Sequence, residues 1–196
     1  APGDCGNGGT TLTSGPFLNM GGDFDRCLRW SLWKLTVDAL DGLGWLGTSV
    51  EEGGARVHRP VTVLADPVDP GEPVQVNTVA FNVSTVEVGD EFEVGSHVTG
   101  VRQPFAFDIY AESDTIGRML RGDLLAVLAG RAPAVGRTEN VLPVLDGSQA
   151  TPPVLVYADI EDLFGGQASG FDDQWRRHWF SVEGVLDVPP YAEVTP

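Results

Sequence analysis

The chain has 196 residues, enough for one domain with a sizeable core, and carries a formal net charge of −16 with a sequence pI near 4.3. Non-specific binding to nucleic acid depends on Lys and Arg, so a chain with a single lysine, Lys34, is not expected to bind DNA or RNA directly. No apolar run approaches the roughly 20 residues of a membrane span, and the opening APGDCGNGG lacks the features of a signal peptide. We therefore expect a cytosolic product without membrane contact.

The first forty residues predict an arm followed by a helix. Residues 1–22 are rich in Gly, Thr and Ser and are expected to form an extended arm, and Asp23 or Asp25 then caps a helix that runs to about Leu43. Its apolar residues recur at helical spacing: Leu28, Leu32, Leu35, Ala39 and Leu40, with Trp30, Trp33 and Val37 beside them. An apolar face this wide predicts burial on two sides, which leaves room for contact with another subunit.

The next sixty residues predict strands. Arg59–Leu64 is a short strand, and a dense Asp/Pro/Gly turn at 66–71 separates it from a longer strand at Val74–Val86. Gly89 and Asp90 turn the chain into a further short strand at Phe92–Val94. The segment His97–Gln103 is expected to be a polar loop, and Phe105–Tyr110 alternates strongly between apolar and polar residues, as a half-buried strand does.

A second helix and the closing strands follow. Ser113 or Asp114 caps a helix over Asp114–Ala129, and Gly130 stands where a helix-ending glycine belongs. Strands are expected at Val141–Leu145, Pro153–Ile160 and Trp179–Val188, a helical turn at Asp172–Arg177, and loops between them. Residues 189–196 read as a tail. The fold class is thus α+β, with a mainly antiparallel sheet and two amphipathic helices on one of its faces, in a single domain over 23–188.

The sequence contains no pattern that identifies a catalytic residue, a cofactor site or a metal site. The three histidines are scattered, and no phosphate-loop, serine-elbow or zinc spacing is present. Cys5 and Cys27 do not form a disulfide framework, and whether they pair stays open. Asp159, Glu161 and Asp162 are the strongest cation candidates, although 28 acidic residues make such clusters common as solvated loop charges.

Candidate interface residues come from the aromatic and cationic clusters. Trp and Arg are enriched at interface hot spots, and Trp175 and Trp179 flank Arg176 and Arg177. The full set of interface candidates is Trp30, Trp33, His97, Arg102, Trp175, Arg176, Arg177 and Trp179. Trp30 and Trp33 belong to the first helix and are expected in the core, whereas for Trp175 and Trp179 a place in the core is as good an interpretation as an interface.

One segment resembles a known family. Glu93–Ser96, a polar loop, the strand-to-helix sequence Phe105–Ser113 and the helix Thr115–Ala129 are similar to the neck proteins of long-tailed phages and archaeal tailed viruses, in particular the tail terminators. The helix Leu28–Leu43 and the strand Arg176–Val188 stand in the order expected of such proteins. The likeness covers about 28–188 in outline, while the chain is longer than a minimal terminator in its arms and in 131–172.

The resemblance implies a structural virion protein, made in the host cytoplasm, without enzymatic activity. Such proteins form a homohexameric ring that caps the tail tube, stops its polymerisation and meets the head-closure or adaptor protein of the neck. Genomic DNA would pass through the lumen without specific binding, because carboxylates repel phosphate. The alternatives are a head-closure or adaptor protein, a hydrolase that uses a carboxylate pair, and a surface binding module.

Overall fold

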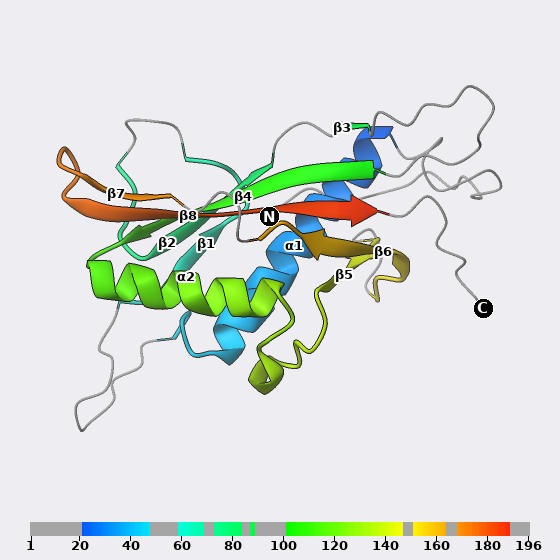
Figure 1. The fold of residues 1–196 in the computed structure, drawn as a ribbon, viewed down its shortest axis with the longest axis horizontal. Helices are drawn as coiled ribbons and strands as arrows, with labels where there is room; N and C mark the ends of the chain where they lie inside the picture. The colour runs from blue at the N-terminus through cyan, green and yellow to red at the C-terminus, as the bar shows by residue number, and fades with distance from the viewer. Residues whose placement is uncertain are drawn as a thin grey trace.

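The computed structural model describes residues 21–47, 59–68, 73–83, 87–88, 101–146, 151–163 and 168–188. Its helices are α1 (Gly21–Gly42), α2 (Asp114–Leu128) and the short 3-10 helix η1 (Pro133–Val135). Its strands are β1 (Thr62–Leu64), β2 (Thr78–Val83), β3 (Glu87–Val88), β4 (Val101–Ala111), β5 (Val141–Leu145), β6 (Val154–Glu161), β7 (Ser169–Asp172) and β8 (Arg177–Val188). The predicted α+β class is confirmed, with α1 and α2 on one side of a mainly antiparallel sheet (Figure 1).

All eight strands belong to one sheet, whose main path runs β1-β2-β4-β8-β6-β5. The central pair is β4 with β8, antiparallel from Val101 opposite Val188 to Ala111 opposite His178. β3 pairs with the beginning of β4, and β7 pairs with the beginning of β8. Among the described strand pairs, only β1 and β2 run parallel. The long strand β8 therefore pairs with β4 on one side, and on the other side with β7 near its start and with β6 near its end.

The core forms between the inner face of this sheet and the two helices. Alternate residues of β4 and β8 point inward in register, so that Phe107 lies opposite Val182 and Ile109 opposite Phe180, all fully buried. Helix α2 covers these strands with apolar residues at helical spacing, namely Ile116, Leu120, Leu124 and Leu128. The helix begins at Ser113, whose hydroxyl accepts a hydrogen bond from the Ile116 amide at 3.2 Å.

Helix α1 contacts both outer strands of the sheet. β1 and β5 lie at opposite ends of the strand order, yet both pack against α1. The helix crosses the sheet obliquely in Figure 1. The sheet is therefore curled around this helix. Leu28, Leu32 and Leu40 are buried along it as predicted. Neither helix of the described chain combines the length and the apolar character that crossing a bilayer requires.

Several predicted boundaries need correction. The expected helical turn at Asp172–Arg177 is the turn of an antiparallel hairpin, because β7 ends at Asp172 and β8 begins at Arg177. The expected loop His97–Gln103 is strand from Val101 onward, while His97 and the expected strand Phe92–Val94 lie outside the described residues. Helix α1 begins at Gly21, slightly before the predicted caps. The remaining parts of both predicted arms, 1–20 and 189–196, are outside the described residues.

Two glycines of α2 provide a matched test of this packing. A methyl group at Gly117 would overlap the Phe180 ring, whereas one at Gly122 would meet nothing within 4 Å. We expect Gly117→Ala to lower the free energy of unfolding by about 1–3 kcal/mol through overpacking. Gly122→Ala should raise it by up to about 1 kcal/mol, because alanine favours the helix. Urea denaturation of both variants measures this, and a stabilised Gly117→Ala protein would contradict the close approach of α2 to β8.

Candidate interaction surfaces

Four of the predicted interface residues meet in one hairpin. β7, the turn 173–176 and the beginning of β8 form what we call the β7–β8 hairpin, residues 169–180, which holds Trp175, Arg176, Arg177 and Trp179. It projects at the end of the molecule where α2 begins (Figure 1). The other candidates lie elsewhere: Trp30 and Trp33 on α1, and Arg102 near the start of β4.

The Asp172 carboxylate holds the turn of the hairpin. One oxygen accepts hydrogen bonds from the backbone amides of Gln174 and Trp175, at 3.0 and 3.2 Å. The other accepts from the guanidinium group of Arg177 at 3.2 Å. A carboxylate bound to its own backbone in this way is a typical turn former. Arg176, at the last turn position, has a φ of 51° and an exposed side chain.

The side chains of Arg177 and Trp179 stabilise the hairpin through contacts inside the subunit. The Arg177 side chain is only 5% exposed, since its guanidinium group pairs with Asp172 and lies 4.3 Å from the centre of the Tyr110 ring. Trp179 lies opposite Gly170, and a methyl group at that glycine would overlap the indole. Both side chains are thus occupied in the folded subunit, and the part of the hairpin open to a partner is its turn and outer strand.

An exposed aromatic side chain marks the outer strand of the hairpin. Phe171 on β7 is 49% exposed, and its ring stands edge-on to the His178 ring at 4.9 Å between centres. The sequence search missed Phe171, because it expected a loop followed by a helical turn here. No local pattern identifies it, because β7 is a strand of only four residues.

On α1, the two predicted tryptophans are half-buried. The Trp33 indole nitrogen lies 3.5 Å from the Val63 carbonyl oxygen of β1, the outermost strand on that side. Trp45, just after the helix, is buried and donates to the Asp123 carboxylate of α2 at 2.7 Å. Its carbonyl oxygen accepts from the Val61 amide at 2.9 Å. These contacts attach α1 to one edge of the sheet and to α2.

The opposite edge strand, β5, is held by α1 as well. Ser31 lies on α1, and its hydroxyl donates to the Cys27 carbonyl at 2.6 Å and accepts from the Leu145 amide of β5 at 2.8 Å. The Val141 carbonyl oxygen accepts a hydrogen bond from the Arg137 side chain at 3.0 Å. Pro143, which lies between Val141 and Leu145 on the strand, has no backbone N–H. Outward-facing backbone groups at both ends of β5 are therefore bound within the subunit, which protects the edge from adding a foreign strand.

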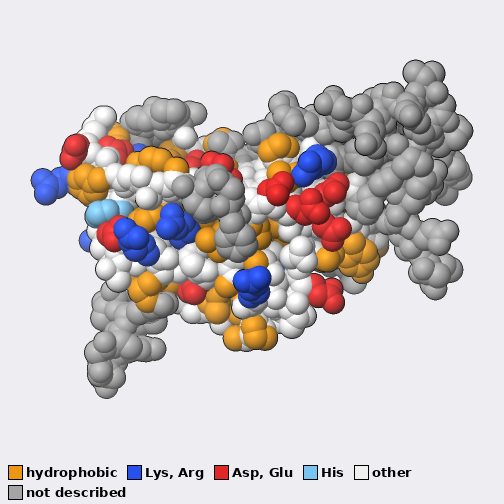
Figure 2. All heavy atoms as spheres, in the orientation of Figure 1, with side chains coloured by type: hydrophobic (Ala, Val, Ile, Leu, Met, Phe, Trp, Pro, Cys, Tyr) orange, Lys and Arg blue, Asp and Glu red, His pale blue; other side chains and the backbone are white. Residues whose placement is uncertain are grey.

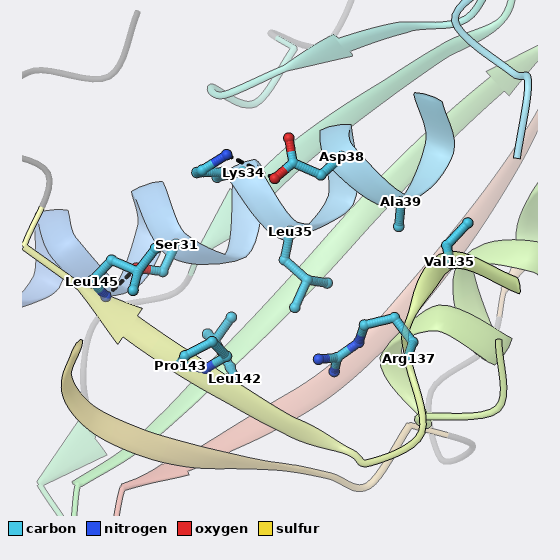
Figure 3. Close-up of a pocket in the computed structure, with 10 residues that line it drawn as sticks. All are labelled: Ser31, Lys34, Leu35, Asp38, Ala39, Val135, Arg137, Leu142, Pro143 and Leu145. Atoms are coloured by element: carbon cyan, nitrogen blue, oxygen red, sulfur yellow. Dashed lines mark hydrogen bonds and ion pairs between the residues drawn. The ribbon is translucent and has the colours of Figure 1, made fainter. Parts of the chain in front are cut away.

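A small cavity lies between α1 and this edge (Figure 3). It measures about 220 Å³, and Leu35 and Leu142 point into it from the helix and the strand. Lys34 and Asp38 form an ion pair of 2.7 Å at its rim, spaced one helical turn apart. Burial lowers the pKa of the Arg137 guanidinium on the far side. The cavity is apolar, and its polar rim groups are paired with each other or with the backbone.

Arg102 lies in an acidic region at the other end of β8 from the hairpin. It approaches Asp162 at 3.3 Å and Glu161 at 3.7 Å. The strand register places Arg102 opposite Asp187, and Asp187 opposite Asp159. We call Asp159, Glu161, Asp162 and Asp187 the acidic end. The sequence identified the first three as a cluster, but Asp187 joins them only through strand pairing.

A larger cavity opens at the acidic end. It measures about 700 Å³, with Ala129, Ile160 and Leu163 among its apolar lining and Glu161 and Asp162 among its charged lining. Within the described part of the chain, no three His, Cys, Asp or Glu side chains come together as a metal site would require. The cation site that Asp159, Glu161 and Asp162 suggested is therefore not formed by those residues.

The outer face of the sheet holds a carboxylate pair that the sequence analysis missed. Asp108 on β4 faces Ser181 on β8, diagonally next to Glu183. Burial, and then the Glu183 charge, raise the pKa of Asp108. Burial and Asp108 likewise raise the pKa of Tyr110, against the opposing charge of Arg177. Only the register of two strands distant in sequence brings these groups together, so no local spacing could reveal the pair.

Removing the Ser31 hydroxyl should loosen α1 from the sheet. Ser31→Ala leaves the Leu145 amide without its partner, which we expect to cost about 1–3 kcal/mol of unfolding free energy. Thr36→Val is the control: Thr36 is buried one turn further on and donates only to the Leu32 carbonyl within α1, at 2.9 Å. Chemical denaturation compares the two. Equal losses would mean that the bond to β5 contributes nothing beyond a local helix contact.

The raised pKa of Asp108 predicts a pH dependence of stability. Between the ordinary value of 3.8 and the raised one, the folded protein binds more protons than the unfolded chain, so stability falls as pH rises through that window. Asp108→Asn should therefore be more stable than the parent at pH 7, and the gain should vanish below pH 3.8. Thermal denaturation at several pH values tests this, with exposed Asp66→Asn as a control for loss of one charge. A gain that is independent of pH would contradict the cause given.

Comparison with known proteins leaves these surfaces to be interpreted from their own chemistry. The chain matches no protein-family model, and no curated protein matches it either. The features that any functional assignment has to use are therefore the projecting β7–β8 hairpin, the acidic end with its cavity, and the Asp108–Glu183 pair.

Proposed function

We propose that this chain is a structural subunit of the head–tail neck of a tailed virus, resembling a tail terminator. The segments that carry the resemblance, Phe105–Ser113 and Thr115–Ala129, fold as the strand β4, a capped turn and the helix α2. Together with β8 they build the centre of the core. Glu93–Ser96 lies outside the described residues. An amphipathic helix that follows its own strand and packs back on the same sheet is the arrangement that the resemblance implies.

The observation that carries this proposal is the β7–β8 hairpin. It projects from the core, is ordered from within by Asp172 and the buried Arg177, and exposes Phe171 and Arg176. An internally braced element that presents an aromatic and a cationic side chain has little conformational freedom to lose on binding, and such residues are typical of protein interfaces. These features favour a protein that contacts other proteins over one that acts on a small molecule.

In this proposal the partners are other copies of the chain, the tail tube protein and the head-closure or adaptor protein. Contacts between two different surfaces of successive copies close a ring when the rotation closes, here a hexamer. A net charge of −16 suits a ring through which DNA passes, because carboxylates facing a lumen repel phosphate. A head-closure or adaptor protein uses the same kind of contacts, and it remains the nearest alternative.

A second candidate function, a carboxylate-dependent hydrolase, is favoured by Asp108 and Glu183. Paired carboxylates whose pKa values differ are the usual acid and base of such enzymes. Here the raised pKa of Asp108 would suit the acid, and Glu183 lies diagonally beside it as the second carboxylate. If the protein hydrolyses glycosidic or ester substrates, Asp108→Asn should abolish that activity while the fold persists.

The mass of the purified protein in solution separates these two functions. The neck proposal predicts a closed oligomer by light scattering at micromolar or higher concentration, or monomers that assemble when tail tube protein is added. Measurements at low and at molar salt show whether charge holds the assembly together. A monomer that neither assembles at any concentration nor binds tube protein would exclude the neck proposal, and hydrolase screening would then be the next step.

A further inference from the structure

The two ends of β8 carry surfaces of opposite character. At its start lies the β7–β8 hairpin and at its end the acidic end, about 36 Å apart for an extended strand of this length. In Figure 2, several Lys and Arg side chains lie on the side of the hairpin and the beginning of α2, together with a few Asp and Glu side chains, and the largest group of Asp and Glu side chains lies on the opposite side. We propose that successive copies associate head to tail, with the β7–β8 hairpin of one copy docking into the cavity at the acidic end of the next. This inference rests on the proposed function and specifies its self-contact.

The hairpin side supplies positive charge and an apolar side chain. Arg176 is exposed at the turn, and Arg118 and Arg121 of α2 lie on the same side. Arg118 hydrogen-bonds Asp114 at 2.6 Å, and the pKa of that carboxyl is lowered first by this bond, with smaller contributions from His178 and Arg121. These charges are therefore close to one another. Phe171 stands exposed beside them.

Within the described part of the chain, the outer edge of β7 has no strand beside it. The Ser181 amide donates to the Ala168 carbonyl at 2.9 Å, which fixes the alternation of the ladder. Gly170 and Asp172 then direct their backbone groups toward β8, whereas Ser169 and Phe171 direct theirs outward. Of the described strands, β8 alone pairs with β7. By contrast, β1 and β5, the ends of the main sheet path, are both bound by α1.

The receiving surface offers the complementary features. The cavity of about 700 Å³ is lined by the half-buried Ala129 and by Ile160 and Leu163, which are 2% and 4% exposed, with Glu161 and Asp162 at its charged part. Four carboxylates of the acidic end stand against two guanidinium groups, those of Arg102 and the cavity-lining Arg131, so the region keeps an excess of negative charge. An exposed phenylalanine with a neighbouring arginine matches an apolar cavity with neighbouring carboxylates.

The placement of these surfaces favours a head-to-tail contact between copies. Two acidic ends would repel each other, so a symmetric dimer through that surface is disfavoured. Different surfaces on opposite sides of the subunit give a heterologous contact, which repeats around a ring. At 0.15 M salt the Debye length is about 8 Å, so repulsion between whole subunits is screened while pairs in direct contact are screened much less.

Charge reversal on each surface tests the contact. We expect Arg176→Asp and Glu161→Arg each to raise the concentration of half-maximal assembly at least tenfold at 0.15 M salt, measured by light scattering or sedimentation. Arg176→Asp keeps the backbone, because Asp tolerates a positive φ. An equimolar mixture of the two variants should restore assembly, since each altered hairpin then meets an altered cavity and each original hairpin an original cavity. Asp66→Arg is the control. It makes the same charge change as Glu161→Arg at an exposed position outside both surfaces, so it should leave assembly unchanged.

A variant without a charge change guards against misfolding as an explanation. Phe171→Ser should weaken assembly to a similar extent at both low and molar salt, with an unchanged melting temperature. If the parent protein assembles and none of the three variants weakens assembly, the hairpin contact is overturned while the ring function stays intact. The same conclusion follows if the mixture of the two charge-reversed variants fails to restore assembly. A parent protein that never assembles, alone or with tube protein, would overturn both.

Discussion

One helix holds the two edges of the sheet. Helix α1 binds the backbone of β5 through Ser31 and approaches that of β1 through Trp33, so a curled sheet that would otherwise end in two unpaired strands is closed by side chains of a helix. An open curled sheet exposes backbone donors and acceptors that attract other chains. Because α1 occupies those positions, the ends of the sheet offer few free backbone groups to a partner, and the proposed contact uses the projecting β7–β8 hairpin instead. The packing of α2, the burial of the core and the availability of the hairpin all depend on this closure.

The hairpin owes its shape to charges that are used internally. Asp172 binds the turn backbone and Arg177, and Arg177 in turn lies over the Tyr110 ring. A buried guanidinium group is stable only when its partners are in place, so this set behaves as a unit. The residues that meet a partner in the proposed contact, Phe171 and Arg176, are those that the unit does not need. In that proposal, stability and recognition are divided between neighbouring positions of the same short segment.

The sequence was sufficient for features that depend on local periodicity. The helix at Asp114–Ala129 and the strand at Val141–Leu145 could be placed almost to the residue, because spacing and capping act within a few positions. Features that depend on register between distant strands could not be placed. Asp108 meets Glu183, and Asp187 meets Asp159, only because β4, β8 and β6 pair as they do. The same reason explains the wrong helical turn at Asp172–Arg177, where aromatic and charged residues gave no alternation long enough to indicate a strand.

The contact between α1 and β5 joins segments that are far apart in the sequence, which affects folding during synthesis. Ser31 and Leu145, which bind each other, are 114 positions apart in the chain. At about 5–20 residues per second, a ribosome needs roughly 6–23 seconds to make the intervening chain. During that interval the apolar face with Leu28, Leu32 and Leu40 has left the ribosome before the β5 strand that covers it exists. Helix α1 therefore emerges well before β5, and this part of the fold is completed only when the later strand packs back onto the earlier helix.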